Sequence, residues 1–211
     1  MDAATPQPRK RGRPPKALDA PSETREALVR AGLVALTQKG FSATGIDEVL
    51  VGVGVPKGSF YHYFKSKEAF GAELIERYAG YFADRLDRFF ADTGLSPLMR
   101  LEAFTRAAEE AMARHDFQRG CLVGNLGQEM GALPESFRRR LCDVFADWQA
   151  RTAACLAQAQ AQGEIGRSHD PHQLAAFFWI GWEGAVLRAK LERSNVPLRT
   201  FAEGFFALVR R

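Results

Sequence analysis

Cysteine is scarce in this 211-residue sequence, and its three cysteines, Cys121, Cys142 and Cys155, do not form a CxxC pair. An odd number without that spacing argues against a disulfide framework and a zinc site, so we expect reduced thiols and no bound metal. Long hydrophobic runs are also missing: the longest apolar stretches, such as Leu174 to Trp182, fall well short of the roughly 20 residues that span a membrane. The N-terminus lacks the apolar segment of a secretory signal. These absences predict a cytoplasmic protein with no membrane partner.

Recognisable catalytic signatures are missing as well. The sequence contains no Ser-His-Asp order, HExxH motif, phosphate-binding loop or dinucleotide-binding fingerprint. Cys121 is the best candidate nucleophile, but no histidine is placed to assist it, because His115 ends a predicted helix and His169 and His172 flank an Asp-Pro pair. The last two are better explained as surface residues than as metal ligands. We therefore expect neither a catalytic residue nor a cofactor.

Positive charge is concentrated at the N-terminus. The segment "PRKRGRPPK" at residues 8–16 gives the first 16 residues five cations against one acid, a balance of +4 that equals the net charge of the whole chain. Residues 1–21 have little to bury, so we expect them to be disordered in isolation. The Arg-Gly-Arg-Pro order resembles an AT-hook, in which Arg11 and Arg13 would enter the narrow minor groove of A·T-rich DNA. A solubilising tail is the alternative.

Helical signals begin at Ser22 and continue to the end, and no stretch alternates convincingly as a strand does. Ser22 and Gly40 are the candidate N-cap and stop of a first helix, and Thr44 is a candidate N-cap for a second. Apolar residues then recur at every fourth position, which predicts one long helix from Lys67 to about Asp92. Further helices are predicted at 97–115, 122–130, 134–162, 171–193 and 197–209. The sequence predicts an all-α fold.

Two short helices joined by a turn around Gly54 have the form of a helix-turn-helix, whose second helix enters the DNA major groove. In "VPKGSFYHYFKSK", Phe60 and Phe64 are four residues apart and are expected to anchor the helix in the core. The opposite side carries residues suited to phosphates and base edges: Lys57, Ser59, Tyr61, His62 and Tyr63. Aromatic core and a solvated basic face are the alternative, but so small a helix does not need this many rings. We therefore favour a DNA-binding helix.

This stretch, from Thr24 to about Leu74, resembles the DNA-binding pattern of the TetR family of bacterial regulators. The resemblance implies an all-α homodimer with an N-terminal helix-turn-helix domain of three helices and a C-terminal helical domain for effector binding and dimerisation. The chain would then divide into a basic arm (1–21), a DNA-binding domain (22–66) and an effector domain (67–211). A symmetric dimer further implies a palindromic double-stranded operator, with half-sites about 34 to 36 Å apart or further.

Residue by residue, the same resemblance assigns roles in DNA binding. Base-edge contacts fall to Lys57, Gly58, Tyr61 and His62, and phosphate contacts fall to Thr44, Ser59, Tyr63 and Lys67. Gly45 stands where many members carry a small hydroxyl residue, so a side-chain contact is lost there.

The last two predicted helices carry more apolar surface than one subunit needs to cover. Small residues, Gly181, Gly184 and Ala185, interrupt an aromatic helix, and the final helix adds Phe201 and Phe205 among others. Two such helices are typical of a four-helix bundle between two subunits. The alternative is that both helices are internal to a monomer.

The stretch "FQRGCLVGNLGQEMG" at residues 117–131 is rich in glycine, and its Cys121 lies close to Arg119, a cation that would favour the thiolate. On pattern alone we prefer an inert buried cysteine. Together with "FWIGWEGAVLRAKLE", this stretch resembles acrylate-responsive members of the TetR family and, more loosely, its electrophile-sensing members. That likeness implies a repressor of acrylate and dimethylsulfoniopropionate catabolism that acrylate or its coenzyme A thioester releases from DNA.

A small unsaturated acid needs a mostly apolar pocket with a few placed polar groups. The expected effector site consists of Cys121, Asn125, Gln128, Trp148, Phe178, Trp179, Trp182 and Arg188. Arg138, Arg139 and Arg140 are candidates for the mouth of a thioester site. Effector binding would alter the dimer so that the recognition helices no longer match the operator, with the long helix from Lys67 as the connection. An electrophile sensor acting through Cys121, and an architectural DNA-binding protein without an effector, remain as alternatives.

Overall fold

The computed structural model describes residues 21–210, so Arg11, Arg13 and the rest of the basic arm lie outside the described residues. Within that range the chain is helical throughout, with one isolated bridge between Ile165 and Arg210, and the all-α prediction is confirmed. No helix of this part of the chain is long and apolar enough to cross a membrane. The helices are α1 (Pro21–Lys39), α2 (Ile46–Val53), α3 (Lys57–Tyr63), α4 (Lys67–Phe90), α5 (Pro97–Ala113), α6 (Leu122–Gln128), α7 (Glu135–Ala161), α8 (Pro171–Glu192) and α9 (Val196–Val209).

The helix ends fall within two residues of the predicted positions because local chemistry sets them. Ser66 caps α4 by accepting a hydrogen bond from the Ala69 N–H at 3.0 Å, and Gly54 ends α2 in the left-handed conformation that glycine adopts without strain. Two predicted caps are wrong. Ser22 lies inside α1, which begins at Pro21, and the residue that caps α2 is Gly45 rather than Thr44.

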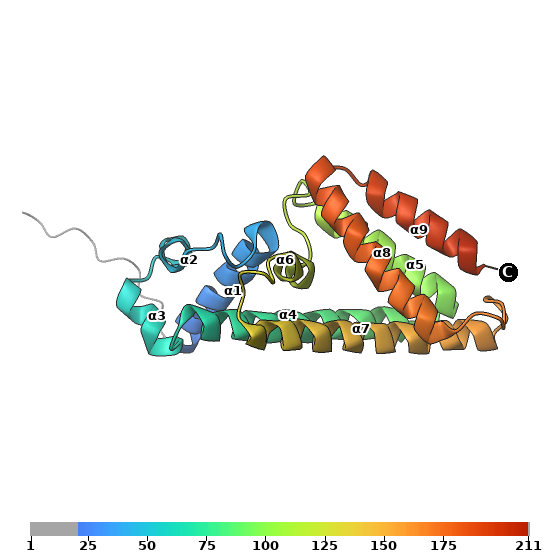
Figure 1. Ribbon diagram of the computed structural model, residues 1–211, viewed down its shortest axis with the longest axis horizontal. Coiled ribbons are helices and arrows are strands. Elements are labelled where there is room, and N and C mark those ends of the chain that lie inside the picture. Colours follow the sequence, from blue (N-terminus) through green and yellow to red (C-terminus); the bar gives the residue numbers. More distant parts are fainter. Residues whose placement is uncertain (1–20, 211) are drawn as a thin grey trace, which may run out of the picture.

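The helices divide into two parts that α4 connects (Figure 1). Helices α1, α2 and α3 gather at one end of the molecule, while α4 runs beside α7 along its long axis and α5, α8 and α9 lie over the other end. Because α4 starts next to α3 and extends under α5, it is common to both parts. The predicted connection between the DNA-binding helices and the C-terminal helices is therefore present in the fold.

Each of the two parts is stabilised by an aromatic cluster of its own. In the first, the ring of Phe60 lies 5.4 Å from that of Phe64 and 5.2 Å from that of Phe70, which confirms that Phe60 and Phe64 face the core. In the second, Trp148 is fully buried, 4.9 Å from Trp179 and 4.3 Å from Phe82 between ring centroids. Burying a large ring contributes on the order of 2 to 3 kcal/mol, so each cluster is a main source of stability for its part.

Helix α6 joins the two parts by polar contacts to the end of α1. The Asn125 side-chain amide donates to the carbonyl oxygens of Leu36 and Thr37, both at 2.9 Å. The Glu129 carboxylate accepts from the Phe41 N–H at 3.0 Å and from the Ser42 N–H at 2.7 Å. These bonds satisfy backbone groups that the end of α1 leaves without helical partners. Helix α6 is therefore tied to the end of α1 and to the first residues of the loop that leads to α2.

Candidate functional site

The outward side of α3 presents the polar and aromatic residues that the sequence analysis singled out. Tyr61 is 54% exposed, His62 is exposed and Tyr63 is half-buried with its ring 4.9 Å from that of His62. A side chain added at Gly58 would meet nothing within 4 Å, so the backbone there is open to a close approach from outside. Ser59 is half-buried. The surface of α3 thus combines aromatic rings, a hydroxyl and an accessible stretch of backbone.

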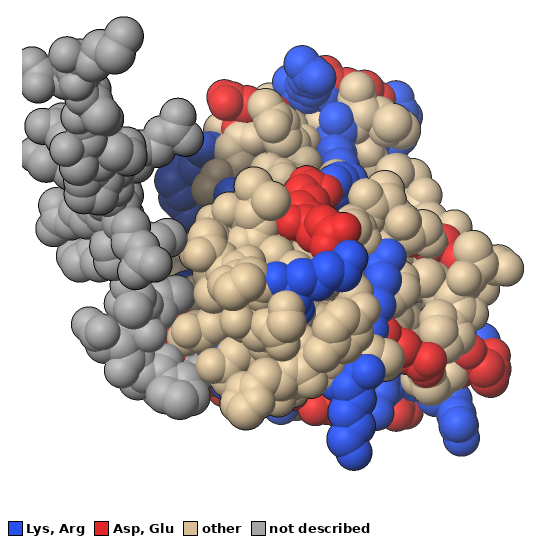
Figure 2. All heavy atoms as spheres, turned by 90° about the vertical axis from the view of Figure 1, so that its left-hand side faces the viewer, with Lys and Arg blue, Asp and Glu red and all other residues tan. Residues whose placement is uncertain are grey.

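Acidic residues of α2 already pair with the lysines nearest this surface. Lys57 Nζ lies 2.9 Å from Asp47 Oδ1, and the hydrogen bond with that carboxylate raises the pKa of Lys57. Lys39 forms a similar pair with Glu48. Seen from this end of the molecule, the described residues show blue and red side chains in contact among neutral ones rather than a broad basic patch (Figure 2). The Asp47 carboxylate therefore takes part of the hydrogen-bonding capacity of Lys57, whose side chain stays 63% exposed.

Two residues predicted to contact phosphates, Thr44 and Lys67, make hydrogen bonds within the chain. Thr44 is 3% exposed, and its hydroxyl donates to the Gly40 carbonyl oxygen at 2.6 Å. Lys67 Nζ donates to the Phe41 carbonyl oxygen at 2.9 Å and lies 4.5 Å from the centre of the Phe41 ring. Both side chains therefore fasten the loop between α1 and α2 in the free protein, and their predicted phosphate contacts stay predictions.

A cavity of about 370 Å³ opens between α1, α4, α5 and α8 and the start of α6. Its volume is within the usual range for small-molecule sites, and its wall is mostly apolar. The apolar lining consists of Leu33, Val34, Phe82, Ala108, Ala111, Met112, Trp182 and Val186. The polar side chains of Tyr78, Cys121 and Glu183 share the cavity with them, and the lining also includes Thr37, Tyr81, Arg85, His115 and Arg119.

Burial raises the pKa values of Tyr78, Cys121 and Glu183. It raises the pKa of Glu183 to about 7, because removing a carboxylate from water disfavours its charged form. Burial also raises the pKa of Cys121 well above its usual value, and the neighbouring Glu183 carboxylate raises it further. The pKa of Tyr78 is raised by the same two causes, burial first and then the charges of Cys121 and Glu183. Cys121 is buried, as the preferred prediction of an inert buried cysteine expects, and burial first and the Glu183 carboxylate second disfavour its thiolate.

The position of Glu183 depends on the glycine opposite. A Cβ atom on Gly124 would lie 2.1 Å from Glu183 Oε2, so only glycine leaves space for the carboxyl at its present place. The Cys121 sulfur in turn accepts a hydrogen bond from the Gly124 N–H at 3.4 Å and so caps α6. The glycine-rich start of α6 thus brings thiol and carboxyl together in the cavity.

Of the eight predicted effector contacts, the cavity lining includes Cys121 and Trp182. Trp148, Phe178 and Trp179 lie in the buried aromatic core behind it, Arg188 is exposed and paired with Glu192, and Asn125 binds the end of α1. Gln128 lies with Asn125 beside a recess of about 10 Å³, which is too small for an organic ligand. Arg138 and Arg140 are paired on α7 with Glu135 and Glu76, outside the cavity lining.

The residues that sequence reasoning missed come chiefly from α4 and α8. Tyr78, Phe82 and Arg85 lie on α4, where a regular apolar repeat concealed them as ordinary core. Glu183 had a usable signal, because it is a lone acid inside the apolar run "FFWIGWEGAVL". An acid in such a run is rarely buried without a reason, so it marks a candidate site.

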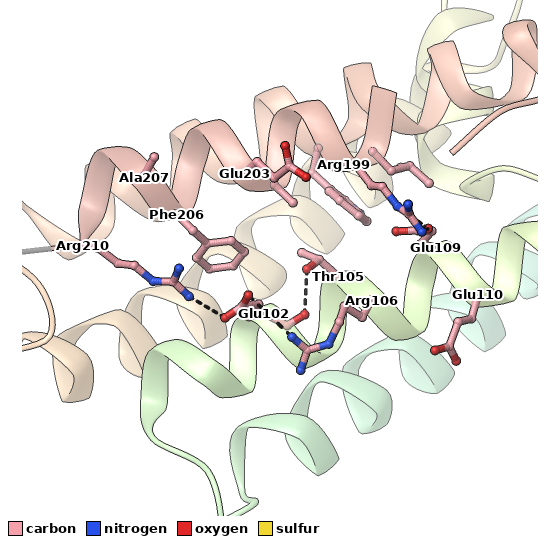
Figure 3. A pocket seen from close by; sticks show the side chains of 13 residues that line it. Glu102, Thr105, Arg106, Glu109, Glu110, Arg199, Glu203, Phe206, Ala207 and Arg210 are labelled. Carbon is pink, nitrogen blue, oxygen red and sulfur yellow. Dashed lines mark hydrogen bonds and ion pairs between the residues drawn. The ribbon is translucent and has the colours of Figure 1, made fainter. Parts of the chain in front are cut away.

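A second hollow, of about 540 Å³, lies between α5 and α9 and has a different character (Figure 3). Charged pairs cross it: Arg210 contacts Glu102 at 2.6 Å and Arg199 contacts Glu109 at 2.7 Å. Glu110 and Glu203 add further carboxylates to its lining. With four carboxylates against three guanidinium groups in its lining, this groove is less suited to an organic acid than the cavity is.

Two protein-family models match the chain. One, described as "Bacterial regulatory proteins, tetR family", matches residues 28–74 and so covers α2, α3 and most of α1. The other, described as "Tetracyclin repressor-like, C-terminal domain", matches residues 97–205. Within residues 21–210, no group of three or more His, Cys, Asp and Glu side chains is arranged to hold a metal ion.

Individual relatives agree with these matches. The chain is 58% identical over 202 residues to the transcriptional regulator AcuR of Cereibacter sphaeroides, covering 96% of this chain and 92% of that protein. It is 35% identical to the HTH-type transcriptional repressor NemR of Escherichia coli K12, covering 83% of this chain and 88% of that protein. The crystal structure of the regulatory protein TetR from Rhodobacter sphaeroides superimposes with a TM-score of 0.87 at 57% identity, covering 88% of this chain and 98% of that one.

Proposed function

The chain belongs to the TetR family of bacterial regulatory proteins, and from this premise we propose that acrylate or its coenzyme A thioester releases it from a palindromic operator. It is a TetR-type DNA-binding transcriptional repressor, because its family and its relatives are transcriptional regulators rather than enzymes. The acrylate response is supported by the identity to AcuR and by the likeness of the α6 and α8 sequences to acrylate-responsive members. We place its action in the cytoplasm, where its operator lies.

The DNA contacts that we propose follow from the exposure of α3. Tyr61 and His62 are exposed and Gly58 leaves the backbone open, which suits direct reading of base edges in the major groove. We propose Ser59 and Tyr63 as phosphate contacts and Lys57 as a further base-edge contact. We retain Arg11 and Arg13 as minor-groove contacts on the strength of their sequence alone.

Homodimer formation is supported by apolar side chains that α8 and α9 leave exposed. Phe177 is 46% exposed, Ile180 73% and Leu208 55%, and a side chain at Gly184 would meet nothing within 4 Å. Gly181 has another role, because a Cβ there would lie 2.1 Å from the Phe201 ring of the same chain. A self-complementary face of this kind is typical of a two-fold dimer, which in turn requires an operator with two-fold symmetry.

The proposed mechanism rests on the contact between the cavity wall and the DNA-binding helices. The Gly120 N–H donates to the Thr37 carbonyl oxygen at 2.9 Å, and both residues line the cavity. An occupant therefore touches the junction between α1 and the start of α6, while its other contacts include Tyr78 and Phe82 on α4. We propose that binding shifts α6 and α4 together and so changes the separation of the two recognition helices. By linkage, operator DNA must weaken effector binding by the same factor.

An electrophile sensor acting through Cys121 is the second candidate. In that reaction the sulfur would bond to the β-carbon of the unsaturated acid, and the thiol proton would go to the α-carbon. The raised pKa of Cys121 opposes the reaction, because the thiolate is the nucleophile. We therefore favour reversible binding, in which Cys121 contributes to the cavity wall.

Fluorescence anisotropy with labelled promoter DNA tests this function. Wild-type protein and Cys121→Ser are bound to the DNA, and acrylate, acryloyl-coenzyme A and the saturated control propionate are then added. We expect the unsaturated compounds to release both proteins and propionate to release neither. Release of the wild type alone would establish the covalent route instead. Tight specific binding that none of the compounds relieves would show that the acrylate assignment is wrong.

A further inference from the structure

A groove of about 490 Å³ adjoins the effector cavity between the second half of α4 and α5. Tyr81 and Arg85 line both hollows, so the two share part of one wall. Beyond this shared wall the groove also contains Arg88 of α4 and Arg114, which caps the C-terminal end of α5. The cavity is mostly apolar, whereas the groove is cationic. A ligand that occupied both would need an apolar end and an anionic end.

The three arginines of the groove have no acidic partner. Within residues 21–210, neither Arg85 nor Arg88 nor Arg114 forms an ion pair. Arg88 Nε donates to the Asp84 backbone oxygen at 3.3 Å, and Arg85 lies 6.0 Å from the centre of the Phe89 ring.

Other arginines of the same domain behave differently. Arg140 pairs with Glu76, and Arg151 contacts both Asp87 and Asp147.

The acids near these arginines are few and partly engaged. Asp92 Oδ1 accepts a hydrogen bond from the Gly94 N–H at 2.9 Å, and Glu110 is the other carboxylate in the lining. Three guanidinium groups against two carboxylates leave an excess of positive charge at the groove. Guanidinium groups bind phosphate oxygens through charge-assisted and often bidentate hydrogen bonds. The groove is therefore suited to the phosphates of a nucleotide.

The part of the cavity beside Glu183, in turn, favours a neutral acyl group over a free acid. Glu183 faces the space that an effector would occupy, and a second carboxylate brought into a low-dielectric site beside it would be repelled. A thioester carbonyl carries no charge and can accept a hydrogen bond from the Tyr78 hydroxyl or a protonated Glu183. The acid would thus enter more readily as a thioester than as its anion.

We propose that the cavity and the groove together bind an acyl-coenzyme A thioester, with the short acyl group beside Cys121, Glu183 and Trp182 and the phosphates on Arg85, Arg88 and Arg114. This assignment rests on the proposed function, since it chooses between the two effectors named there. Tyr81 is 55% exposed at the junction and offers an aromatic face to the connecting arm or to the adenine. In this proposal, arginines of α4 and α5 take the place of Arg138, Arg139 and Arg140, the candidates for the mouth of a thioester site.

Isothermal titration calorimetry on the full chain tests the proposal with three probes: acryloyl-coenzyme A, acrylate and free coenzyme A. We expect the thioester to bind at least about tenfold more tightly than acrylate, and more tightly than free coenzyme A, which lacks the acyl group. Arg88→Ala combined with Arg114→Ala should weaken thioester binding by roughly tenfold or more and leave acrylate unchanged. Both side chains are exposed, so the variant should fold, which circular dichroism checks.

The matched control is Arg139→Ala, an exposed arginine on α7 outside the groove, which should bind all three probes as the wild type does. Equal affinity for acrylate and its thioester, or unchanged thioester binding in the double variant, would overturn the proposal. DNA release is recorded in parallel to separate the two conclusions. Release by acrylate without tighter thioester binding keeps the proposed function and rejects the thioester site. Tight, arginine-dependent thioester binding that never releases DNA supports the site and rejects the proposed function.

Discussion

At the α2–α3 end, the aromatic and polar side chains that the small core does not need lie exposed, whereas between α4, α5 and α8 the corresponding side chains lie inward around a cavity. Tyr61 and His62 face solvent on α3, while Tyr78 and Glu183 face the cavity. An exposed functional group keeps its hydration until a partner arrives, so it carries little desolvation cost in the free protein. A buried one is already desolvated, and its pKa records that cost. The proposed DNA-binding surface is therefore recognised by exposed side chains that the core does not need. The proposed effector cavity is recognised by the raised pKa values of the groups that line it.

The largest expected effect comes from truncating Phe60, the core residue of α3. It separates the buried side of that helix, which stabilises the protein, from its exposed side. Phe60 is fully buried against Phe64 and Phe70, so Phe60→Ala should destabilise the protein by about 3 to 5 kcal/mol through lost transfer energy and a cavity. DNA affinity should fall with it. Chemical denaturation followed by circular dichroism measures the change, and a loss under about 1 kcal/mol would show that the ring is not a main source of stability.

The buried carboxyl gives the next largest effect, through pH. Glu183 has a pKa of about 7 in the folded protein against an ordinary value of 4.5, so between these values the folded state holds a proton that the unfolded state has released. The free energy of unfolding should therefore fall as pH rises through that window, by about 3 kcal/mol in total, and the loss should be complete above the folded pKa.

The Glu183→Gln variant has no titratable carboxyl at this position, so its free energy of unfolding should not fall with pH in this window. Tyr78 and Cys121, the titratable groups beside it, stay protonated throughout this window because their pKa values are raised. Denaturation at several pH values checks both proteins. A wild type whose stability rises between pH 5 and 8, or a glutamine variant that follows the wild type, would contradict the cavity half of the comparison.

An exposed ring of α3 should affect DNA and leave stability unchanged. Tyr61→Ala removes a side chain that is 54% exposed, so stability should change by less than about 0.5 kcal/mol. If the ring reads a base edge, operator affinity should drop by about 1 to 3 kcal/mol, while binding to unrelated DNA should change less. Anisotropy titrations with both DNAs measure this. Equal losses on the two DNAs would make Tyr61 a general backbone contact.

The smallest expected effect concerns the junction between the two regions. Asn125→Ala removes two hydrogen bonds to the end of α1 and should cost about 1 to 2 kcal/mol of stability. Because α6 is then held less firmly, the effector should shift operator affinity by a smaller factor than in the wild type. Titration of the DNA complex with effector gives that factor, with Gln128→Ala, an exposed residue of the same helix, as the control. An unchanged factor would mean that α4 carries the coupling alone.

How far the sequence predicts this molecule depends on where each signal lies. Helix positions were accurate because caps, glycines and prolines act locally, as Ser66 and Gly54 show. Thr44 misled because a threonine before a helix is usually a cap, and only the packed loop reveals that its hydroxyl serves Gly40.

The residues that line the cavity were harder to predict from the sequence, for a related reason. Tryptophans are as suitable for a core as for a pocket, and local sequence cannot show that Trp182 borders the cavity while Trp148 and Trp179 lie behind it. Asn125 was recognised as unusual, but its partners are about 88 residues away in the sequence. Contacts of that separation depend on tertiary packing, which no local pattern encodes.

The central claim is that the cavity between α4, α5 and α8 controls the DNA-binding end, and filling it tests this most directly. Ala111→Trp places a large ring in the cavity, whereas Ala113→Trp places the same ring on an exposed position of α5 outside it. The measurement is release of operator DNA by acryloyl-coenzyme A, followed by anisotropy. We expect both variants to bind DNA, the Ala113 variant to be released at the wild-type concentration, and the Ala111 variant to have lost that response. Release of the Ala111 variant at the wild-type concentration would contradict the central claim.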